Sequence, residues 1–255
     1  MLVDAHAHLL DKKFNKDRFD LIKALPESGV GCVIECASDM DSSVRAAALA
    51  EEYHIIYAAV GVHPHDAKEW EVYNGPELRA LAARDKVVAI GEIGLDYHYD
   101  FSPRKAQQEV FEKQLDLAKD LNMPVVIHSR EATEDTVSIL KAHSGIKGMM
   151  HSFAGSVETM ETLLGLGYYF SFGGMITFAN AKKPAASAAA VPLDRFMVET
   201  DCPYMTPTPH RGERNTPAYV RLVAEKIAAL KSIAYDEVEE LSTANAAAFF
   251  GLDIN

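Results

Sequence analysis

We predict a single α/β domain of the (β/α)8, or TIM, barrel class for this chain of 255 residues. Eight short, mostly apolar runs recur along the sequence, segments with helical periodicity separate them, and potential metal-ligating side chains follow several of the runs. A barrel of this class takes about 250 residues, so one domain over residues 1–255 accounts for the chain. A doubly wound open sheet shows the same alternation and is the alternative.

The strands and helices are predicted from these patterns. The strands cover 2–9, 31–38, 55–63, 87–95, 124–129, 147–153, 167–173 and 196–201, and most are almost continuously apolar, as parallel strands covered on both faces are. Helices are expected at 17–25, 43–53, 76–84, 104–121, 133–142 and 157–164, in the alanine-rich stretch 185–190, and at 218–231 and 236–250 after a proline-rich loop. The segments Ser28-Gly29, Ser144-Gly145 and Gly165-Leu166-Gly167 lie at or just before the starts of strands, where helix C-caps are expected.

The charge, the cysteines and the first residues of the chain each argue against particular classes of protein. A formal net charge of −12 argues against a protein that coats duplex DNA, because such proteins use positive charge to collect phosphates, whereas a local site with bound dications remains possible. The three cysteines have no metal-binding or CxxC spacing, so reduced thiols are expected. The first residues enter a strand pattern without the basic and apolar regions of a signal peptide, which predicts a cytoplasmic protein.

The first predicted strand ends in two histidines. His6 and His8 are two residues apart, so both side chains project from one face of the strand and can bind one metal ion. Asp4 lies two residues earlier on that face, where it either orients a ligand or packs deeper in the barrel.

Four more potential ligands end later strands. Glu92 is flanked by Gly91 and Gly94, and its two carboxylate oxygens could bridge two cations; a carboxylated lysine does this in some barrel hydrolases, but here no lysine ends a predicted strand. A plain ion pair with Arg130 is the alternative for Glu92. The other three residues end strands five, six and eight in matching positions: His128, His151 and Asp201. Asp201 is predicted to be a metal ligand or a general base.

A second set lies near these ligands. His63, after strand three, is a candidate catalytic residue that could reach a metal, a phosphate oxygen or a leaving group, and His65 either contacts substrate or caps a loop. Arg130 is a candidate phosphate clamp, because a guanidinium binds oxyanions through two hydrogen bonds.

Six motifs in this order resemble the TatD family of metal-dependent deoxyribonucleases over the whole chain. They are Asp4-Ala5-His6-Ala7-His8, Gly61-Val62-His63-Pro64-His65, Gly91-Glu92-Ile93-Gly94-Leu95-Asp96-Tyr97, His128-Ser129-Arg130, His151-Ser152-Phe153 and Glu199-Thr200-Asp201-Cys202-Pro203-Tyr204. Arg214, Asn215 and Pro217 extend the resemblance, whereas Thr216 stands where a glutamate is expected.

The resemblance implies a (β/α)8 hydrolase that cleaves single-stranded DNA from a 3′ end with two divalent cations, which the ligand types allow to be Mg, Mn or Zn. By motif, His6, His8, Glu92 and Asp201 would hold one ion, and Glu92, His128 and His151 the other, with Asp201 accepting a proton from water. The substrate partner would then be nucleic acid, with no membrane and no obligate protein partner. The rival interpretations are a barrel hydrolase acting on a small amide, ester or lactone, and a non-catalytic binding protein.

Overall fold

The structure is a computed structural model that describes residues 1–253, and its chain divides into two compact units. The first unit comprises residues 1–35, residues 152–162 and the chain from Tyr169 onward. The second unit comprises residues 36–151 and 163–168. Each unit has its own strands, covering helices and buried core.

The first unit contains two pairs of parallel strands. β1 (Leu2–Ala7) pairs with β2 (Val30–Cys36), and β7 (Tyr169–Phe172) pairs with β8 (Phe196–Val198). A parallel bridge between Ala7 and Cys202 joins β1 to the segment that follows β8.

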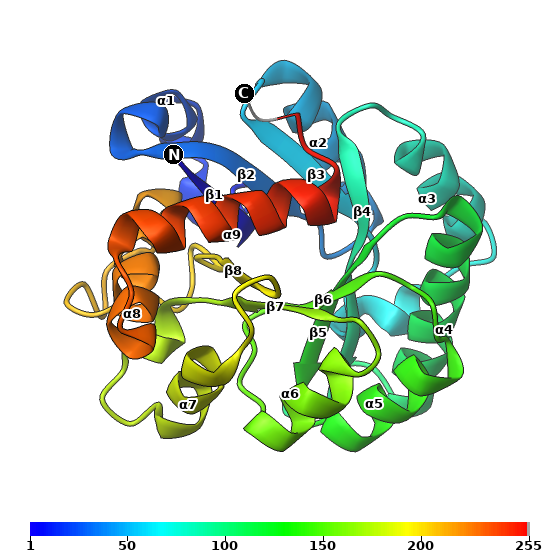
Figure 1. The fold of residues 1–255 in the computed structure, drawn as a ribbon. Helices are drawn as coiled ribbons and strands as arrows, with labels where there is room; N and C mark the ends of the chain where they lie inside the picture. Colours follow the sequence, from blue (N-terminus) through cyan, green and yellow to red (C-terminus); the bar gives the residue numbers. More distant parts are fainter. Residues whose placement is uncertain (254–255) are drawn as a thin grey trace. The chain divides into compact units, whose positions relative to one another are not determined.

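The helices of the first unit are α1 (Arg18–Ala24), α6 (Val157–Leu164, of which the residues up to Thr162 belong here), α7 (Lys182–Ala190), α8 (Val220–Lys231) and α9 (Tyr235–Phe250). α9 packs on β1 and β8 and lies beside α8, as Figure 1 shows. Short 3-10 helices lie at Lys12–Phe14, Pro26–Ser28, Gly174–Thr177 and Pro217–Tyr219.

The second unit contains four parallel strands in sequence order. They are β3 (Ile56–Val60), β4 (Val87–Asp96), β5 (Val125–Arg130) and β6 (Gly148–Met150). Its helices are α2 (Met40–Glu52), α3 (Asn74–Ala82), α4 (Arg104–Leu121) and α5 (Thr133–Ala142), and a 3-10 helix, η3, spans Pro64–Glu69. α4 covers β4 in Figure 1, and α2 packs along β3.

Local sequence explains where these elements begin and end. Asp39 caps α2 by accepting a hydrogen bond from the Ser42 backbone, and the Ser42 hydroxyl satisfies the Asp39 backbone in return. Gly29, Gly145 and Gly167 all adopt left-handed φ values of 82° to 87°. Gly29 is the C-cap of the 3-10 helix Pro26–Ser28, as predicted, whereas the C-cap of α5 is His143.

Eight parallel strands alternate with helices along residues 1–253, which confirms the (β/α)8 barrel class. The sequential strand order in the second unit lacks the reversal of a doubly wound sheet. β4 is buried at every position, as its continuous apolar pattern predicted. β3, β6 and β8 end at Val60, Met150 and Val198, earlier than predicted, so the potential ligands His63, His151 and Asp201 lie just after these strands.

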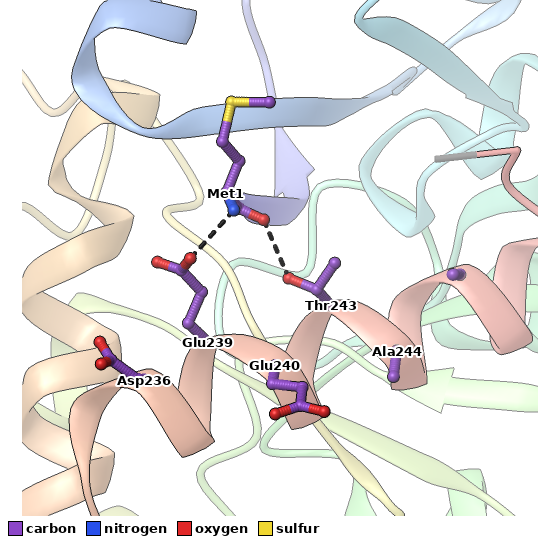
Figure 2. A pocket seen from close by; sticks show the side chains of 7 residues that line it. Met1, Asp236, Glu239, Glu240, Thr243 and Ala244 are labelled. Carbon is purple, nitrogen blue, oxygen red and sulfur yellow. Dashed lines mark hydrogen bonds and ion pairs between the residues drawn. The ribbon is translucent and has the colours of Figure 1, made fainter. Parts of the chain in front are cut away.

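The start of the chain is anchored on α9. The Met1 ammonium group donates to Glu239 Oε1 at 2.9 Å, and Thr243 Oγ1 donates to the Met1 carbonyl oxygen at 3.1 Å (Figure 2). A shallow hollow of about 290 Å³ lies here, lined by Met1 and residues of α9. The hollow lies at the amino-terminal end of β1, whereas His6 and His8 lie at its carboxyl-terminal end. In barrels of this class the amino-terminal face of the strands serves stability, and active sites lie at the opposite face.

Cys32, Cys36 and Cys202 are buried and are not joined in disulfide bonds, and the first two lie in one strand, β2, as predicted. None of the helices in residues 1–253 is sufficiently long and apolar to span a lipid bilayer.

Candidate metal centre

His6, His8 and Asp201 form a group of potential ligands in the first unit. The two Nε2 atoms of the histidines are 3.1 Å apart. Asp201 Oδ1 lies 3.4 Å from His8 Nε2 and 3.9 Å from His6 Nε2. The predicted pairing of two same-face histidines with the aspartate that follows β8 is therefore present.

Asp4 holds the residue next to Asp201 in place. Its carboxylate accepts hydrogen bonds from the Thr200 backbone nitrogen at 2.8 Å and the Thr200 hydroxyl at 2.5 Å. The Asp201 backbone nitrogen donates to the His6 carbonyl oxygen at 2.9 Å, and Asp201 adopts a left-handed φ of 56°. These bonds hold the Asp201 side chain against the histidines, so Asp4 has the orienting role that was one of its two predicted alternatives.

Glu35, at the end of β2, was not predicted. It is 1% exposed and accepts hydrogen bonds from the backbone nitrogens of Leu9 and Leu10 at 2.6 and 3.0 Å. Burial raises the pKa of Glu35 to about 7. Glu35 therefore fixes the turn directly after His8, and its position at a strand end was the sequence signal that could have identified it.

Glu92 lies at the middle of a second group, the Glu92 cluster, which consists of His63, Glu92, His128 and His151. Glu92 Oε1 is 3.5 Å from His63 Nε2, 3.0 Å from His128 Nδ1 and 2.9 Å from His151 Nε2. His128 Nδ1 and His151 Nε2 are 3.1 Å apart. β4, β5 and the residue after β6 bring three of these side chains together, as the sequence predicted.

Asp96 orients the imidazole of His128. Asp96 Oδ2 lies 3.0 Å from His128 Nε2 and 3.1 Å from His65 Nε2. Burial disfavours the charged form of Asp96, but hydrogen bonds from His128 and the Tyr99 backbone outweigh it and hold the pKa of Asp96 well below its ordinary value. With His128 Nε2 directed at Asp96, Nδ1 is the nitrogen that faces Glu92 Oε1 and that could bind a metal ion there, as in metal-bound histidines whose other ring nitrogen donates to a carboxylate.

His63 has the opposite proton arrangement. Its Nδ1 accepts a hydrogen bond from the His65 backbone nitrogen at 3.1 Å, so the proton of the neutral ring is on Nε2. Burial lowers the pKa of His63 to about 4, which keeps the ring neutral. Although its nitrogen lies within reach of a metal in this cluster, the proton on Nε2 makes His63 a hydrogen-bond donor.

The donor set fits divalent cations. The first unit offers two imidazole nitrogens and a carboxylate oxygen, and the Glu92 cluster offers a carboxylate with the nitrogens of His128 and His151. Mixed imidazole and carboxylate ligands suit Zn, Mn and Fe, and Asp96 supplies the hydrogen-bonded support that metal-ligating histidines require.

The predicted substrate residues have different surroundings. His65 is half-buried and engaged with Asp96, whereas Arg130 is exposed, with its guanidinium carbon 4.8 Å from the centre of the Tyr99 ring. Within residues 1–253 no carboxylate forms an ion pair with Arg130, so the alternative pair with Glu92 is not formed. Arg214, from the last loop, forms an ion pair with Asp17 at 2.6 Å.

Substitution of Asp96 tests its orienting role. Asp96→Ala is expected to lower metal affinity by about 10- to 100-fold, because His128 would lose the acceptor that fixes its ring and tautomer. Metal affinity is measured by competition with a chromogenic chelator. Asp100→Ala is the control, since Asp100 is exposed and contacts Arg104 outside the cluster. Unchanged affinity in Asp96→Ala would contradict the role.

Known proteins resemble the chain over almost its full length. Residues 3–251 match the family described as TatD related DNase. A Bacillus subtilis (strain 168) protein described as the uncharacterized metal-dependent hydrolase YabD is 44% identical, over 99% of this chain and all of its own length. An Erwinia amylovora protein described as 3'-5' ssDNA/RNA exonuclease TatD is 32% identical, over 98% of this chain and all of its own length.

A solved structure shares the fold. The crystal structure of YjjV, a TatD homologue from Escherichia coli K12, matches with a TM-score of 0.93 and 31% identity over 98% of both chains. The motifs, the clustered ligands and the family match agree. The chain therefore belongs to the TatD family and is a metal-dependent hydrolase with a (β/α)8 barrel fold.

Proposed function

We propose that this hydrolase is a 3′–5′ exonuclease that removes nucleotides from single-stranded DNA. The main observation in support is the Glu92 cluster, in which one carboxylate oxygen lies within 3.0 Å of two imidazole nitrogens that can bind metal. The exonuclease name of the Erwinia amylovora relative supports the substrate class.

By motif, we assign the predicted ligand residues to two divalent cations. One cation would be held by His6, His8, Glu92 and Asp201, and the other by Glu92, His128 and His151. Mg, Mn and Zn all remain compatible with this ligand set.

Bound cations would supply a water of lowered pKa and positive charge beside the leaving oxygen of the phosphodiester. Asp201 accepts the proton of that water through its carboxylate. His63 donates from Nε2 to a phosphate or leaving oxygen, since its proton is on that atom. Arg130 binds a phosphate oxygen with its unpaired guanidinium, and His65 lines the approach to the Glu92 cluster.

A panel assay tests the proposal. The purified protein, supplied in turn with Mg, Mn and Zn, is incubated with 3′- and 5′-labelled single-stranded DNA, with duplex DNA and with a set of amides, esters and lactones. We expect metal-dependent release of nucleotides from the 3′ end of single strands. Hydrolysis of carbonyl substrates alone would instead support the small-molecule hydrolase, and no hydrolysis of either class would support the binding protein.

The Asp201→Ala variant tests whether the measured activity comes from the proposed metal site. Loss of the proton acceptor is expected to lower kcat by about 100- to 10,000-fold. Glu112→Ala, an exposed position on α4, is expected to retain the wild-type rate. Retention of wild-type nuclease activity by Asp201→Ala would attribute the activity to another site or to a contaminant.

A further inference from the structure

Two large aromatic rings are exposed on the loop between β4 and α4. Tyr99 is 47% exposed and Phe101 is 56% exposed. Their ring centres are 5.2 Å apart, and the ring planes are inclined by only 24°. A stacked pair that remains in solvent forgoes the free energy that burial would provide, which indicates a binding surface.

The loop that holds these rings is fixed at both ends. At its start, Asp96 Oδ1 accepts hydrogen bonds from the backbone nitrogens of His98 at 3.0 Å and Tyr99 at 2.9 Å. At its end, Ser102 Oγ donates to the His65 carbonyl oxygen at 2.7 Å, and Gln107 Nε2 donates to the Ser102 carbonyl oxygen at 2.8 Å. The rings are therefore held in place before any ligand arrives, which lowers the entropy cost of binding.

The positively charged side chain of Arg130 lies beside these rings. The Arg130 guanidinium carbon is 4.8 Å from the centre of the Tyr99 ring. The nearby Arg104 is neutralised by Asp100 at 2.8 Å, whereas no carboxylate within the described part of the chain forms an ion pair with Arg130. Arg130 thus keeps its hydrogen-bond donors available for an oxyanion.

The aromatic pair adjoins the Glu92 cluster through His65. The His65 ring contacts Tyr99 and Phe101 edge-on, with ring centres 5.4 and 4.8 Å apart. His65 Nε2 contacts Asp96 Oδ2, the same oxygen that contacts His128 Nε2. A chain seated on the rings would therefore lie beside the proposed metal ligands.

We propose that Tyr99 and Phe101 form a stacking platform for unpaired bases of single-stranded DNA, with Arg130 binding the adjacent phosphate. This inference rests on the proposed nuclease function and adds the subsite that selects single strands. Unpaired bases offer a free face to aromatic side chains, whereas the bases of a duplex are already stacked. On a protein of net charge −12, stacking and one local cation replace a general positive field.

Steady-state kinetics of the Tyr99→Ala/Phe101→Ala double variant test the platform. We expect the KM for a short oligothymidylate to rise by about 10-fold or more, with kcat within about threefold of wild type, because each base stack contributes to binding. An oligonucleotide with two abasic nucleotides at its 3′ end provides a second measurement. Removal of those bases should raise the wild-type KM to the level of the variant, and should leave the KM of the variant unchanged.

Matched variants complete the experiment. Tyr99→Phe/Phe101→Tyr should keep the wild-type KM because it preserves both rings, and Tyr73→Ala, which removes a 55% exposed ring on the same unit, should also keep it. Arg130→Ala should raise KM and reduce its dependence on salt concentration. Cleavage by the wild type with an unchanged KM in the double variant would overturn the platform alone. Failure of the wild type to cleave any nucleic acid would overturn the proposed function and the platform together.

Discussion

Glu92→Ala is expected to abolish hydrolysis, with a fall in kcat/KM of about 1,000-fold or more. Glu92 is 3% exposed, and its Oε1 faces three imidazole nitrogens. The substitution removes the ligand proposed to be shared by two cations. Without those cations in place, the water on which the reaction depends would not be activated. The rate is measured at saturating metal on single-stranded DNA, so that weaker metal binding alone does not account for the loss.

Glu112→Ala is the matched control, because it removes a carboxylate from an exposed position of the same unit. Circular dichroism and thermal melting of both variants show whether the fold is retained. A folded Glu92→Ala protein that hydrolyses DNA at more than about a tenth of the wild-type rate would contradict the role of the Glu92 carboxylate.

Gly94→Ala is expected to destabilise the fold by roughly 4 kcal/mol, through backbone strain and overpacking together. Gly94 pairs with His128 across β4 and β5 and has a φ of 139°, which residues with a side chain rarely adopt. A Cβ at this position would lie 2.0 Å from the His128 carbonyl oxygen. Relief of that clash must move β4 or β5, and with it the Glu92 cluster.

The melting temperature measures this effect. For a chain of this size the predicted loss corresponds to a decrease in Tm of roughly 10 °C. Gly75→Ala is the control, because a Cβ added at Gly75 in α3 would have nothing within 4 Å of it and alanine favours helices. Gly75→Ala should alter Tm by a few degrees at most. Equal Tm values for Gly94→Ala and the wild type would show that the close approach at His128 is not obligatory.

The sequence predicted the parts of the site that depend on the ends of strands. Because β-strands alternate their side chains, two histidines two residues apart were expected to project from one face, and the Nε2 atoms of His6 and His8 lie 3.1 Å apart. The convergence of Glu92, His128 and His151 followed from parallel strands whose carboxyl ends share one edge. The bounds of α4, α5 and α6 were predicted without error because helical periodicity and flanking turns marked both ends.

The sequence did not predict contacts that depend on the register between strands or on the path of a loop. Asp96 contacts His128 because β4 continues beyond Glu92 and pairs Asp96 with Arg130, and this register is not readable from one strand alone. The alternation of Glu92, Gly94 and Asp96 on one face was a usable signal for it. The stacking of Tyr99 on Phe101 depends on a turn fixed by Asp96, and periodicity carries no information about such turns.

Metal content tests the central hypothesis most directly, namely that the two ligand groups hold a pair of divalent cations. Wild-type protein, His6→Ala and Glu92→Ala are loaded with Mn or Zn, freed of unbound metal and measured by elemental analysis. We predict about two ions per wild-type chain, a clear loss in His6→Ala and a greater loss in Glu92→Ala. Full occupancy in both variants, or no metal uptake by the folded wild-type protein, would contradict the hypothesis.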